Sequence, residues 1–312
     1  MTQPALPDAV DIREVAPRDG LQIEAPISTG DKVRLLQALA ATGVRRIEAT
    51  AFVSPRAIPS MADAEDVAAA LRDLPDLEWS ALVAGVGGAR RAVAAGVRTL
   101  EYVVSASDGH SLANARRTTE EAVAAIAEVA SLVHDVGGRC EVIVATAWDC
   151  PFDGRTPTGR VAGIAARAVE LGADQLCLGD TIGTTTPVRV TALVDEVRAA
   201  APGVPLGVHF HNTRGMGMAN AYAAVLAGVT QLDASIGGLG GCPFAPGASG
   251  NIATEELVYL LDDAGVRTGV DLGAALDAAR VAQELVRHPL ESNVLRAGGR
   301  LKPLPRPVEV PA

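Results

Sequence analysis

The chain has 312 residues, enough for one large α/β domain, since single barrels of this class can reach roughly 250 residues. Hydrophobic residues make up 48% of the chain and aromatic residues only 3%, so the core must be built from Ala, Val, Leu and Ile, which suits parallel strands covered by helices. A formal charge of −10 argues against nonspecific binding to nucleic acid, although a local cluster of arginines can still hold a small anionic substrate.

The cysteines and the apolar segments predict a cytoplasmic protein. The four cysteines are too few and too scattered for a disulfide scaffold, and no CxxC pair indicates structural zinc. Residues 1–10 lack the basic and apolar regions of a signal peptide. No apolar run reaches the roughly 18 residues that a membrane helix needs, so we expect no contact with a membrane.

Short β-rich segments alternate with Ala-rich amphipathic segments along the whole chain. The eight predicted strands span residues 11–15, 46–49, 78–83, 100–105, 141–145, 175–178, 206–210 and 231–235. The clearest helical patterns span residues 31–42, 119–136 and 188–200. The helix start signals are Ser28 or Thr29, Thr118 or Thr119, and Thr186 with Pro187. The glycines that suit helix ends are Gly43, Gly96, Gly137, Gly172 and Gly228.

Eight strand–helix units in about 275 residues predict a (β/α)8 TIM barrel. A doubly wound open sheet would show the same alternation, but the number and regular spacing of the units favour the barrel. Residues 252–287 are predicted to form two extra helices of the same domain, which would then span residues 1–287. Residues 288–312 are predicted to be a C-terminal tail, loosely attached where it becomes rich in Pro and Arg.

Polar residues follow the predicted strands at the ends where such barrels build their active sites. They are Arg18 and Asp19 after the first strand, Glu48 in the end of the second, Asp180 after the sixth, His209 and His211 at the end of the seventh, and Cys242 and Asn251 after the eighth. We therefore expect these side chains to meet at one mouth of the barrel.

The segment around His209 and His211 indicates a metal site. Residues two apart on a strand point to the same face, and a divalent metal is the usual reason for two imidazoles to converge. With the carboxylate of Asp19 they leave open coordination positions, and the oxygen ligand favours Mg²⁺ or Mn²⁺, although Zn²⁺ and Fe²⁺ stay open. The alternative is a pair of partly buried histidines bonded to the backbone.

The charged residues near this pair have two interpretations each. Arg18 is always charged and can hold an oxyanion or a carboxylate, whereas the Asp19-Gly20 pair can simply serve a turn. Glu48 and Asp180 can orient Arg18 or a histidine, or accept a substrate hydroxyl. Structural ion pairing is the alternative for both carboxylates.

A glycine-rich segment, residues 237–251, follows the last predicted strand. It is not a Walker loop, because the Gly-Lys-Ser/Thr ending is absent. Cys242 in such a loop can swing over a substrate and transfer a proton, although free cysteine more often behaves as a small hydrophobe. Asn251 can supply a carbonyl oxygen to the metal or cap the helix that begins near residue 253.

Several of these segments together resemble a known family. The matching motifs are Arg18-Asp19-Gly20-Leu21-Gln22, Phe52-Val53-Ser54-Pro55, Cys150-Pro151-Phe152-Asp153-Gly154, Leu178-Gly179-Asp180-Thr181-Ile182-Gly183, the His209/His211 pair, and Gly238-Leu239-Gly240-Gly241-Cys242-Pro243 with Gly250-Asn251-Ile252-Ala253-Thr254-Glu255. Over residues 10–286 the chain resembles 3-hydroxy-3-methylglutaryl-CoA lyase, within the wider metal-dependent barrel lyases and Claisen-type condensing enzymes. The Gly-Gly-Cys-Pro segment is the specific part, because the condensing branch carries a different segment there.

The resemblance implies roles for particular residues. The implied ligands of Mg²⁺ or Mn²⁺ are Asp19, His209, His211 and Asn251. Arg18 would neutralise the developing enolate, and Cys242 would be the mobile acid–base residue; Asp19 and His209 would also take part in catalysis. The predicted substrate-binding residues are Gln22, Glu48 and Asp180, together with Arg214, which stands where the family has another residue. The resemblance further implies an acyl-CoA substrate and, by analogy, a homodimer.

The reaction of the resembled family is cleavage of 3-hydroxy-3-methylglutaryl-CoA to acetyl-CoA and acetoacetate. One alternative is a Claisen-type enzyme that joins acetyl-CoA to a 2-oxo acid, which the Cys242 segment disfavours. A non-catalytic metal-binding barrel is a further alternative, and the intact set of candidate residues argues against it.

Three segments depart from the pattern of the family. Residues 212–215 read Asn-Thr-Arg-Gly where the family has Asp-Thr-Tyr-Gly, residues 105–111 lack the family's Phe and Asn-Ile-Asn, and residues 286–288 only approximate its Asn-Arg-Lys. A related 3-hydroxy-3-alkylglutaryl-CoA or a citramalyl-type CoA ester is therefore an open alternative. Arg214 and His110 can read a different acyl tail or lie solvated at the surface, and for His110 we favour the surface.

Overall fold

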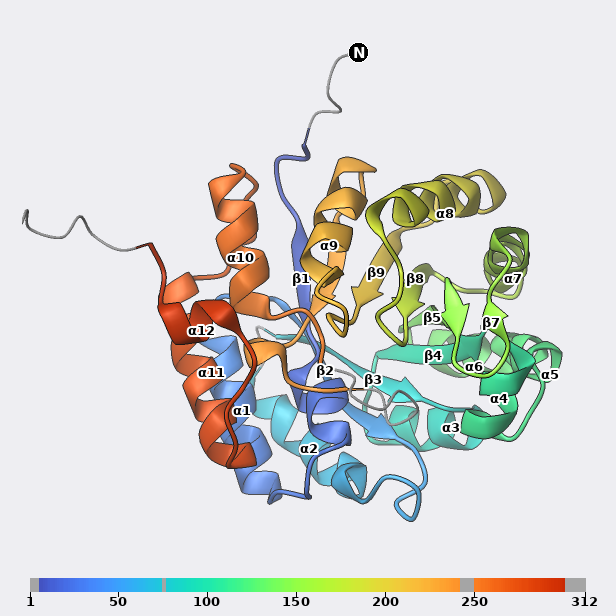
Figure 1. Cartoon of the computed structure of the whole chain (residues 1–312). Coiled ribbons are helices and arrows are strands. Elements are labelled where there is room, and N and C mark those ends of the chain that lie inside the picture. Colours follow the sequence, from blue (N-terminus) through green and yellow to red (C-terminus); the bar gives the residue numbers. More distant parts are fainter. Residues whose placement is uncertain (1–5, 75–76, 242–249, 301–312) are drawn as a thin grey trace, which may run out of the picture.

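The computed structural model describes residues 6–74, 77–241 and 250–300. Its main feature is a closed barrel of parallel strands in the order β1-β10-β9-β8-β5-β4-β3-β2 (Figure 1). The barrel strands are β1 (Asp11–Glu14), β2 (Arg46–Phe52), β3 (Glu78–Val83), β4 (Thr99–Ser105), β5 (Arg139–Ala145), β8 (Gln175–Asp180), β9 (Leu206–Phe210) and β10 (Gln231–Ala234). All eight predicted strands are present, and the predicted TIM barrel is confirmed.

Helices surround the barrel, and short turns join them to the strands (Figure 1). They are α1 (Thr29–Ala40), α2 (Ala64–Ala70), α3 (Val86–Ala94), α4 (Asp108–Ala115), α5 (Thr119–Ala124), α6 (Ile126–His134), α7 (Thr158–Glu170), α8 (Pro187–Ala200), α9 (Gly217–Leu226), α10 (Thr254–Asp263), α11 (Leu272–Val286) and α12 (Asn293–Ala297). None of the described helices is long and apolar enough to cross a membrane.

The predicted helix signals act as expected with one exception. Ser28 caps α1 by accepting from Asp31 N, and Thr118 forms a capping box with Glu121 at the start of α5. The five predicted helix-end glycines all have φ between 73° and 103°, a range that L side chains rarely adopt. The single helix predicted over residues 119–136 was wrong, because the segment is interrupted at one residue, Ala125 (φ −76°, ψ −10°), and forms α5 and α6.

The C-terminal region and one hairpin add to the barrel. The two extra helices predicted over residues 252–287 are α10 and α11, and α11 packs against α1. Within the predicted tail, Ser292 caps the short helix α12, which packs against α10 and α11; the boundary at residue 287 stays a prediction. A two-stranded antiparallel hairpin, β6 (Asp149–Cys150) with β7 (Gly154–Arg155), was not predicted.

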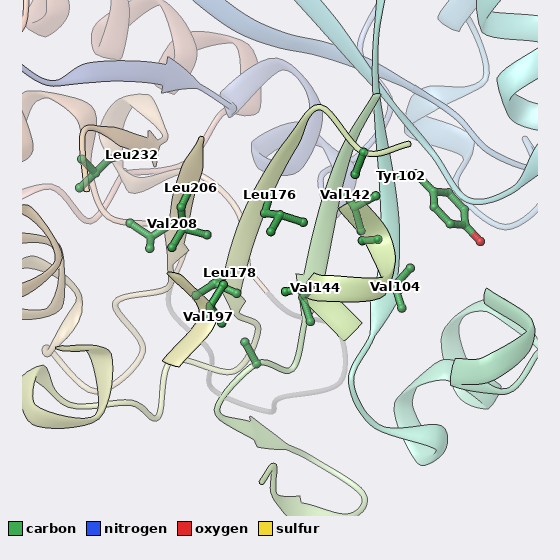
Figure 2. Packing of buried hydrophobic residues seen from close by; sticks show 14 of the residues in the cluster. Tyr102, Val104, Val142, Val144, Leu176, Leu178, Val197, Leu206, Val208 and Leu232 are labelled. Carbon is green, nitrogen blue, oxygen red and sulfur yellow. The ribbon is translucent and has the colours of Figure 1, made fainter. Parts of the chain in front are cut away.

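The apolar core lies between the barrel and its helices. Alternate residues of the strands, such as Val142, Val144, Leu176 and Leu178, belong to one buried cluster together with Val197 of α8 (Figure 2). The residues between them face the inside of the barrel, because side chains alternate along a strand. Charged side chains occupy much of that interior: Arg13, Glu101, Glu141 and Asp233 are each at most 6% exposed.

Candidate metal centre

Three predicted metal ligands meet at the C-terminal ends of β1 and β9. Asp19, His209 and His211 each offer a ligand atom, and these atoms all lie within 4.8 Å of one another. Asp19 Oδ2 is 3.6 Å from His211 Nε2 and 3.9 Å from His209 Nε2. Two atoms that each bind one ion at ~2.1 Å are at most about 4.2 Å apart, so both separations suit a shared ion.

His211 gives an independent test of whether a cation fits. The residue is 5% exposed, and neither of its ring nitrogens has a hydrogen-bond partner among the described residues. An unpaired buried polar group costs free energy, and coordination to a cation would remove that cost. Two imidazole nitrogens and a carboxylate oxygen are a donor set that divalent cations accept, so these residues fit a metal ion.

Asp19 is held in its charged form. Burial alone would raise its pKa, but the Arg18 guanidinium, followed by His211 and His209, outweighs burial and holds the pKa of this carboxyl well below its usual range. A tight π-helical turn, Ala16–Gly20, presents Asp19 to the site, because Val15 O accepts from three successive backbone N–H groups, those of Arg18, Asp19 and Gly20.

Arg18 lies beside the candidate metal ligands and joins them to Glu48. Its Nη1 is 2.6 Å from Asp19 Oδ1, and its Nε is 2.6 Å from Glu48 Oε1. Both partners are carboxylates from different strand ends, so the guanidinium is fixed in orientation. Burial, reinforced by nearby Glu101 and opposed by Arg18, raises the pKa of Glu48 well above its usual range.

Asn251 also lies in the cluster. Its Nδ2 donates to Asp19 Oδ2 (2.8 Å) and to Leu239 O (3.0 Å), and the residue is 3% exposed. The backbone on either side of it pairs with the end of β9, through Asn212 N to Gly250 O (3.0 Å) and Ile252 N to Phe210 O (3.2 Å). Asn251 does not cap α10, whose N-cap residue is Ala253. It lies beside Asp19, as expected for a residue of the metal site, and ligation by its oxygen stays a prediction.

The other predicted substrate-binding residues, which are Asp180 at the end of β8 and two residues outside the strands, make structural contacts. Asp180 accepts from Thr184 N (3.0 Å) and Thr185 N (3.2 Å), so it fixes the loop before α8. Arg214 donates to Ile182 O (2.9 Å) and Gly183 O (3.2 Å) of that same loop. Gln22 contributes its backbone oxygen, which accepts from Ser60 Oγ. Their roles toward a substrate stay predictions.

Two further sequence predictions had different outcomes. His110 is 3% exposed, and its Nδ1 is 2.6 Å from Ser105 Oγ, so the expectation of a surface residue was wrong. The reason is that α4 lies against β4 and turns this side chain inward. Cys242 lies outside the described residues. The other three cysteines are free and buried, as expected.

The sequence interpretation missed a pair of charged residues behind His209. Asp233 Oδ2 is 3.1 Å from His209 Nδ1, and Arg13 contacts both oxygens of Asp233 at 2.8 Å. Burial would raise the pKa of Asp233, but Arg13 and His209 hold it well below its usual range. The available signal was weak, because β1 reads Asp-Ile-Arg-Glu, so Arg13 is one charged residue among several, and only Asp233 is charged in β10.

Comparison with known proteins identifies the family. The HMGL-like family model matches residues 9–282. The chain belongs to the HMGL-like family. The resemblance to hydroxymethylglutaryl-CoA lyase and the prediction of an oxo-acid lyase are thereby confirmed at the level of the family.

Two relatives of this HMGL-like protein carry different names. An (R)-citramalyl-CoA lyase from Chloroflexus aurantiacus is 41% identical over 302 residues, which cover 93% of this chain and 95% of that protein. A hydroxymethylglutaryl-CoA lyase from Pseudomonas mevalonii is 41% identical over 282 residues, which cover 89% of this chain and 93% of that protein. The similarity therefore leaves the acyl group open.

A solved structure matches the fold over nearly the whole chain. It is an HMG-CoA lyase from Acinetobacter baumannii in complex with coenzyme A and 3-methylmalate. The TM-score is 0.91 with 40% sequence identity, and the match covers 96% of this chain and 98% of that chain. The barrel and its added helices are thus a shared architecture of these lyases.

Proposed function

We propose that this HMGL-like protein is a metal-dependent carbon–carbon lyase that cleaves a 3-hydroxy-3-methyl acyl-CoA, with 3-hydroxy-3-methylglutaryl-CoA as the first candidate and acetyl-CoA and acetoacetate as products. The observation that carries this proposal is the buried Asp19–His209–His211 cluster with Arg18 beside it. A divalent cation bound there, Mg²⁺ or Mn²⁺, would supply Lewis acidity to the hydroxyl and carboxylate oxygens of the substrate.

The residues around the cluster match the needs of C2–C3 cleavage. The 3-hydroxyl must lose its proton, and the Asp19 carboxylate at the centre of the cluster can accept it, while His209 would hold the metal beside it. The departing thioester enolate carries negative charge that needs fixed donors. Arg18, held between Asp19 and Glu48, is such a donor and is positioned before the reaction begins. 

The enolate must then take up a proton, and we assign this step to the Cys242 thiol. The support is the position of Cys242 in the sequence, between Gly240 and Gly250, which both lie at the cluster. Gly240 is so close to Asn251 that a Cβ there would come within 2.6 Å of the Asn251 Nδ2. Gly250 pairs with the residue after His211. The segment that carries Cys242 therefore begins and ends beside the candidate ligands.

A second substrate, citramalyl-CoA, is favoured by the Chloroflexus aurantiacus relative. Citramalyl-CoA and 3-hydroxy-3-methylglutaryl-CoA share the tertiary 3-hydroxyl, the methyl group and the CH2–thioester unit. They differ by one methylene between the carbinol carbon and the free carboxylate, so the same cluster can act on both. One methylene changes discrimination by only about 10- to 200-fold, so activity on both esters is expected.

The test is an assay of the metal-stripped protein with both CoA esters, before and after addition of Mn²⁺ or Mg²⁺. Metal-dependent release of acetyl-CoA with acetoacetate or pyruvate is the expected result, and the ratio of kcat/KM values ranks the substrates. Condensation of acetyl-CoA with a 2-oxo acid without cleavage of either ester would instead favour the Claisen-type alternative. A homodimer and a cytoplasmic location remain part of the proposal, checked by light scattering and fractionation.

A further inference from the structure

We infer that Arg13 and Asp233 are positioning residues that fix the tautomer and the orientation of His209 for the metal ion. Neither residue belongs to the candidate ligand set, and both lie inside the barrel, behind that set. The inference rests on the proposed metal site but does not depend on which acyl-CoA is the substrate.

The strand register places the three side chains next to one another. Arg13 of β1 is in register with Asp233 of β10, and Asp233 is in register with His209 of β9. Residues in register on neighbouring strands point to the same side of the sheet, which here is the barrel interior. The side chains of Arg13, Asp233 and His209 are 4%, 8% and 12% exposed, so water competes little for these contacts.

The contact between Asp233 and His209 selects one tautomer. Both oxygens of Asp233 accept from Arg13 at 2.8 Å, so this side chain faces His209 as an acceptor, and His209 Nδ1, 3.1 Å from Oδ2, is the donor. The lone pair of the neutral ring is then on Nε2, the nitrogen that lies 3.9 Å from Asp19 Oδ2. A carboxylate behind a metal-ligating histidine commonly acts in this way. His211 differs, because neither of its nitrogens has a partner among the described residues.

Arg13 in turn fixes Asp233. Its Nε and Nη2 contact the two carboxylate oxygens at 2.8 Å each, which is a bidentate pair. Its Nη1 contacts Glu141 Oε2 at 2.7 Å and Glu101 Oε1 at 2.8 Å, so the guanidinium cannot rotate away. Without Arg13, the Asp233 carboxylate would lack the two contacts that hold it against His209. The contacts therefore form a chain from Glu101 and Glu141 through Arg13 and Asp233 to His209.

The competing interpretation is that Arg13 and Asp233 only stabilise the barrel. The two interpretations differ for Asp233→Asn, which keeps the size of the side chain but can present an N–H to His209. A purely structural pair would lower the thermal stability and leave His209 unchanged in the protein that remains folded. A positioning pair would change the tautomer of His209 and the affinity for metal.

The experiment uses the full chain and two readouts that do not require substrate. Mn²⁺ affinity is measured by electron paramagnetic resonance, and the protonated nitrogen of His209 is read from ¹⁵N NMR of the metal-free protein at a pH where the ring is neutral. We expect Asp233→Asn to weaken Mn²⁺ binding about 10- to 100-fold and to move the proton toward Nε2. Unchanged affinity and tautomer in the folded variant would overturn the inference.

The chain offers a matched control in a second aspartate–histidine pair. Asp174 Oδ2 is 2.8 Å from His134 Nε2, on partly exposed side chains away from the cluster. Asp174→Asn should leave Mn²⁺ affinity and the His209 signal unchanged. If it weakened Mn²⁺ binding as much as Asp233→Asn does, the effect would be general and the inference would fail.

A second variant covers the case in which Asp233→Asn does not fold. Arg13→Lys keeps one positive charge among the carboxylates but cannot contact both oxygens of Asp233 and Glu141 at the same time. We expect Arg13→Lys to weaken Mn²⁺ binding by less than about tenfold, which is less than the loss expected for Asp233→Asn. If Arg13→Lys bound Mn²⁺ as the wild type does, Arg13 would have no positioning role. A wild-type protein that fails to bind Mn²⁺ would overturn both this inference and the proposed function, whereas normal binding in wild type and both variants would overturn the inference alone.

Discussion

The two faces of each barrel strand differ in chemistry, and β9 shows the difference within four residues. Val208 and Phe210 point outward and belong to the apolar cluster under the helices. His209 and His211 point inward, where they meet Asp19. The alternation separates two tasks, because the outward residues hold the helices on the barrel while the inward residues hold the reactive groups. Substitutions on the inward face should therefore weaken metal binding and change stability little. Substitutions on the outward face should lower stability and leave metal binding unchanged.

The largest expected effect is on the inward face. His211→Leu replaces a candidate ligand with an apolar side chain of similar size. We therefore expect Mn²⁺ binding to be lost and lyase turnover to fall about 1,000-fold or more, the equivalent of several kcal/mol. Because His211 makes no hydrogen bond to a described residue and only helps to keep Asp19 charged, the metal-free variant should lose little stability. Isothermal titration with Mn²⁺, steady-state kinetics and thermal melts without metal check the three parts.

A His211→Leu variant that binds Mn²⁺ as the wild type does would remove His211 from the metal site. A large loss of stability in the metal-free variant would instead mean that the imidazole has a structural partner. Either result would break the separation between the two faces of β9.

The next effect is on the outward face, at Leu178 of β8. Leu178 is fully buried in the cluster that contains Val197 of α8 (Figure 2). Leu178→Ala should lower the free energy of unfolding by about 2–5 kcal/mol, because it leaves a cavity among packed side chains. Mn²⁺ affinity of the folded variant should not change. Urea denaturation and Mn²⁺ titration check the two parts, with Val188→Ala on the 79% exposed side chain of α8 as a control that changes neither.

Most of the fold could be predicted because most strands contain a short apolar run and several helices have their own start and end signals. Ser28, Thr118 and the helix-end glycines act locally, so a single sequence displays them. The break between α5 and α6 could not be predicted, because Ala125 is a good helix former and nothing in its neighbourhood signals a turn. The β6–β7 hairpin is too short, at two residues a strand, to show a period.

The candidate site was predictable only where its residues lie at strand ends. Asp19, His209 and His211 follow or end apolar runs, and barrel geometry brings such ends together. Arg13 and Asp233 lie 220 positions apart in the sequence, and their meeting depends on the register of β1, β10 and β9. Gln22 and Arg214 lie outside the strands and Asp180 is the last residue of β8, so the strand pattern does not show what these side chains contact.

Glu14 of β1 is the exception that sharpens the comparison, because it is a carboxyl on the outward face. It is 1% exposed, forms no ion pair with any residue that the structure describes, and accepts from Ala16 N, Ile236 N and Thr254 Oγ1. Burial, reinforced by Glu255 and opposed by these donors, raises its pKa from 4.5 to about 7. The folded state thus binds this proton more tightly than the unfolded state does.

The sign of the pH effect follows from that raised pKa. The contribution of Glu14 to stability is complete below about pH 4.5 and is lost as the pH rises through about 7. Glu14→Gln resembles the protonated acid, so it should match the wild type at pH 5 and be more stable at pH 8, by at most about 3 kcal/mol. Urea denaturation at pH 5, 6, 7 and 8 measures the difference. Glu120→Gln is the control, because Arg167 lowers the pKa of exposed Glu120 and keeps its titration below this range. If the free energies of unfolding of Glu14→Gln and the wild type changed in parallel with pH, Glu14 would stay ionised in the folded protein. The outward face would then carry a buried charge, as the inward face does.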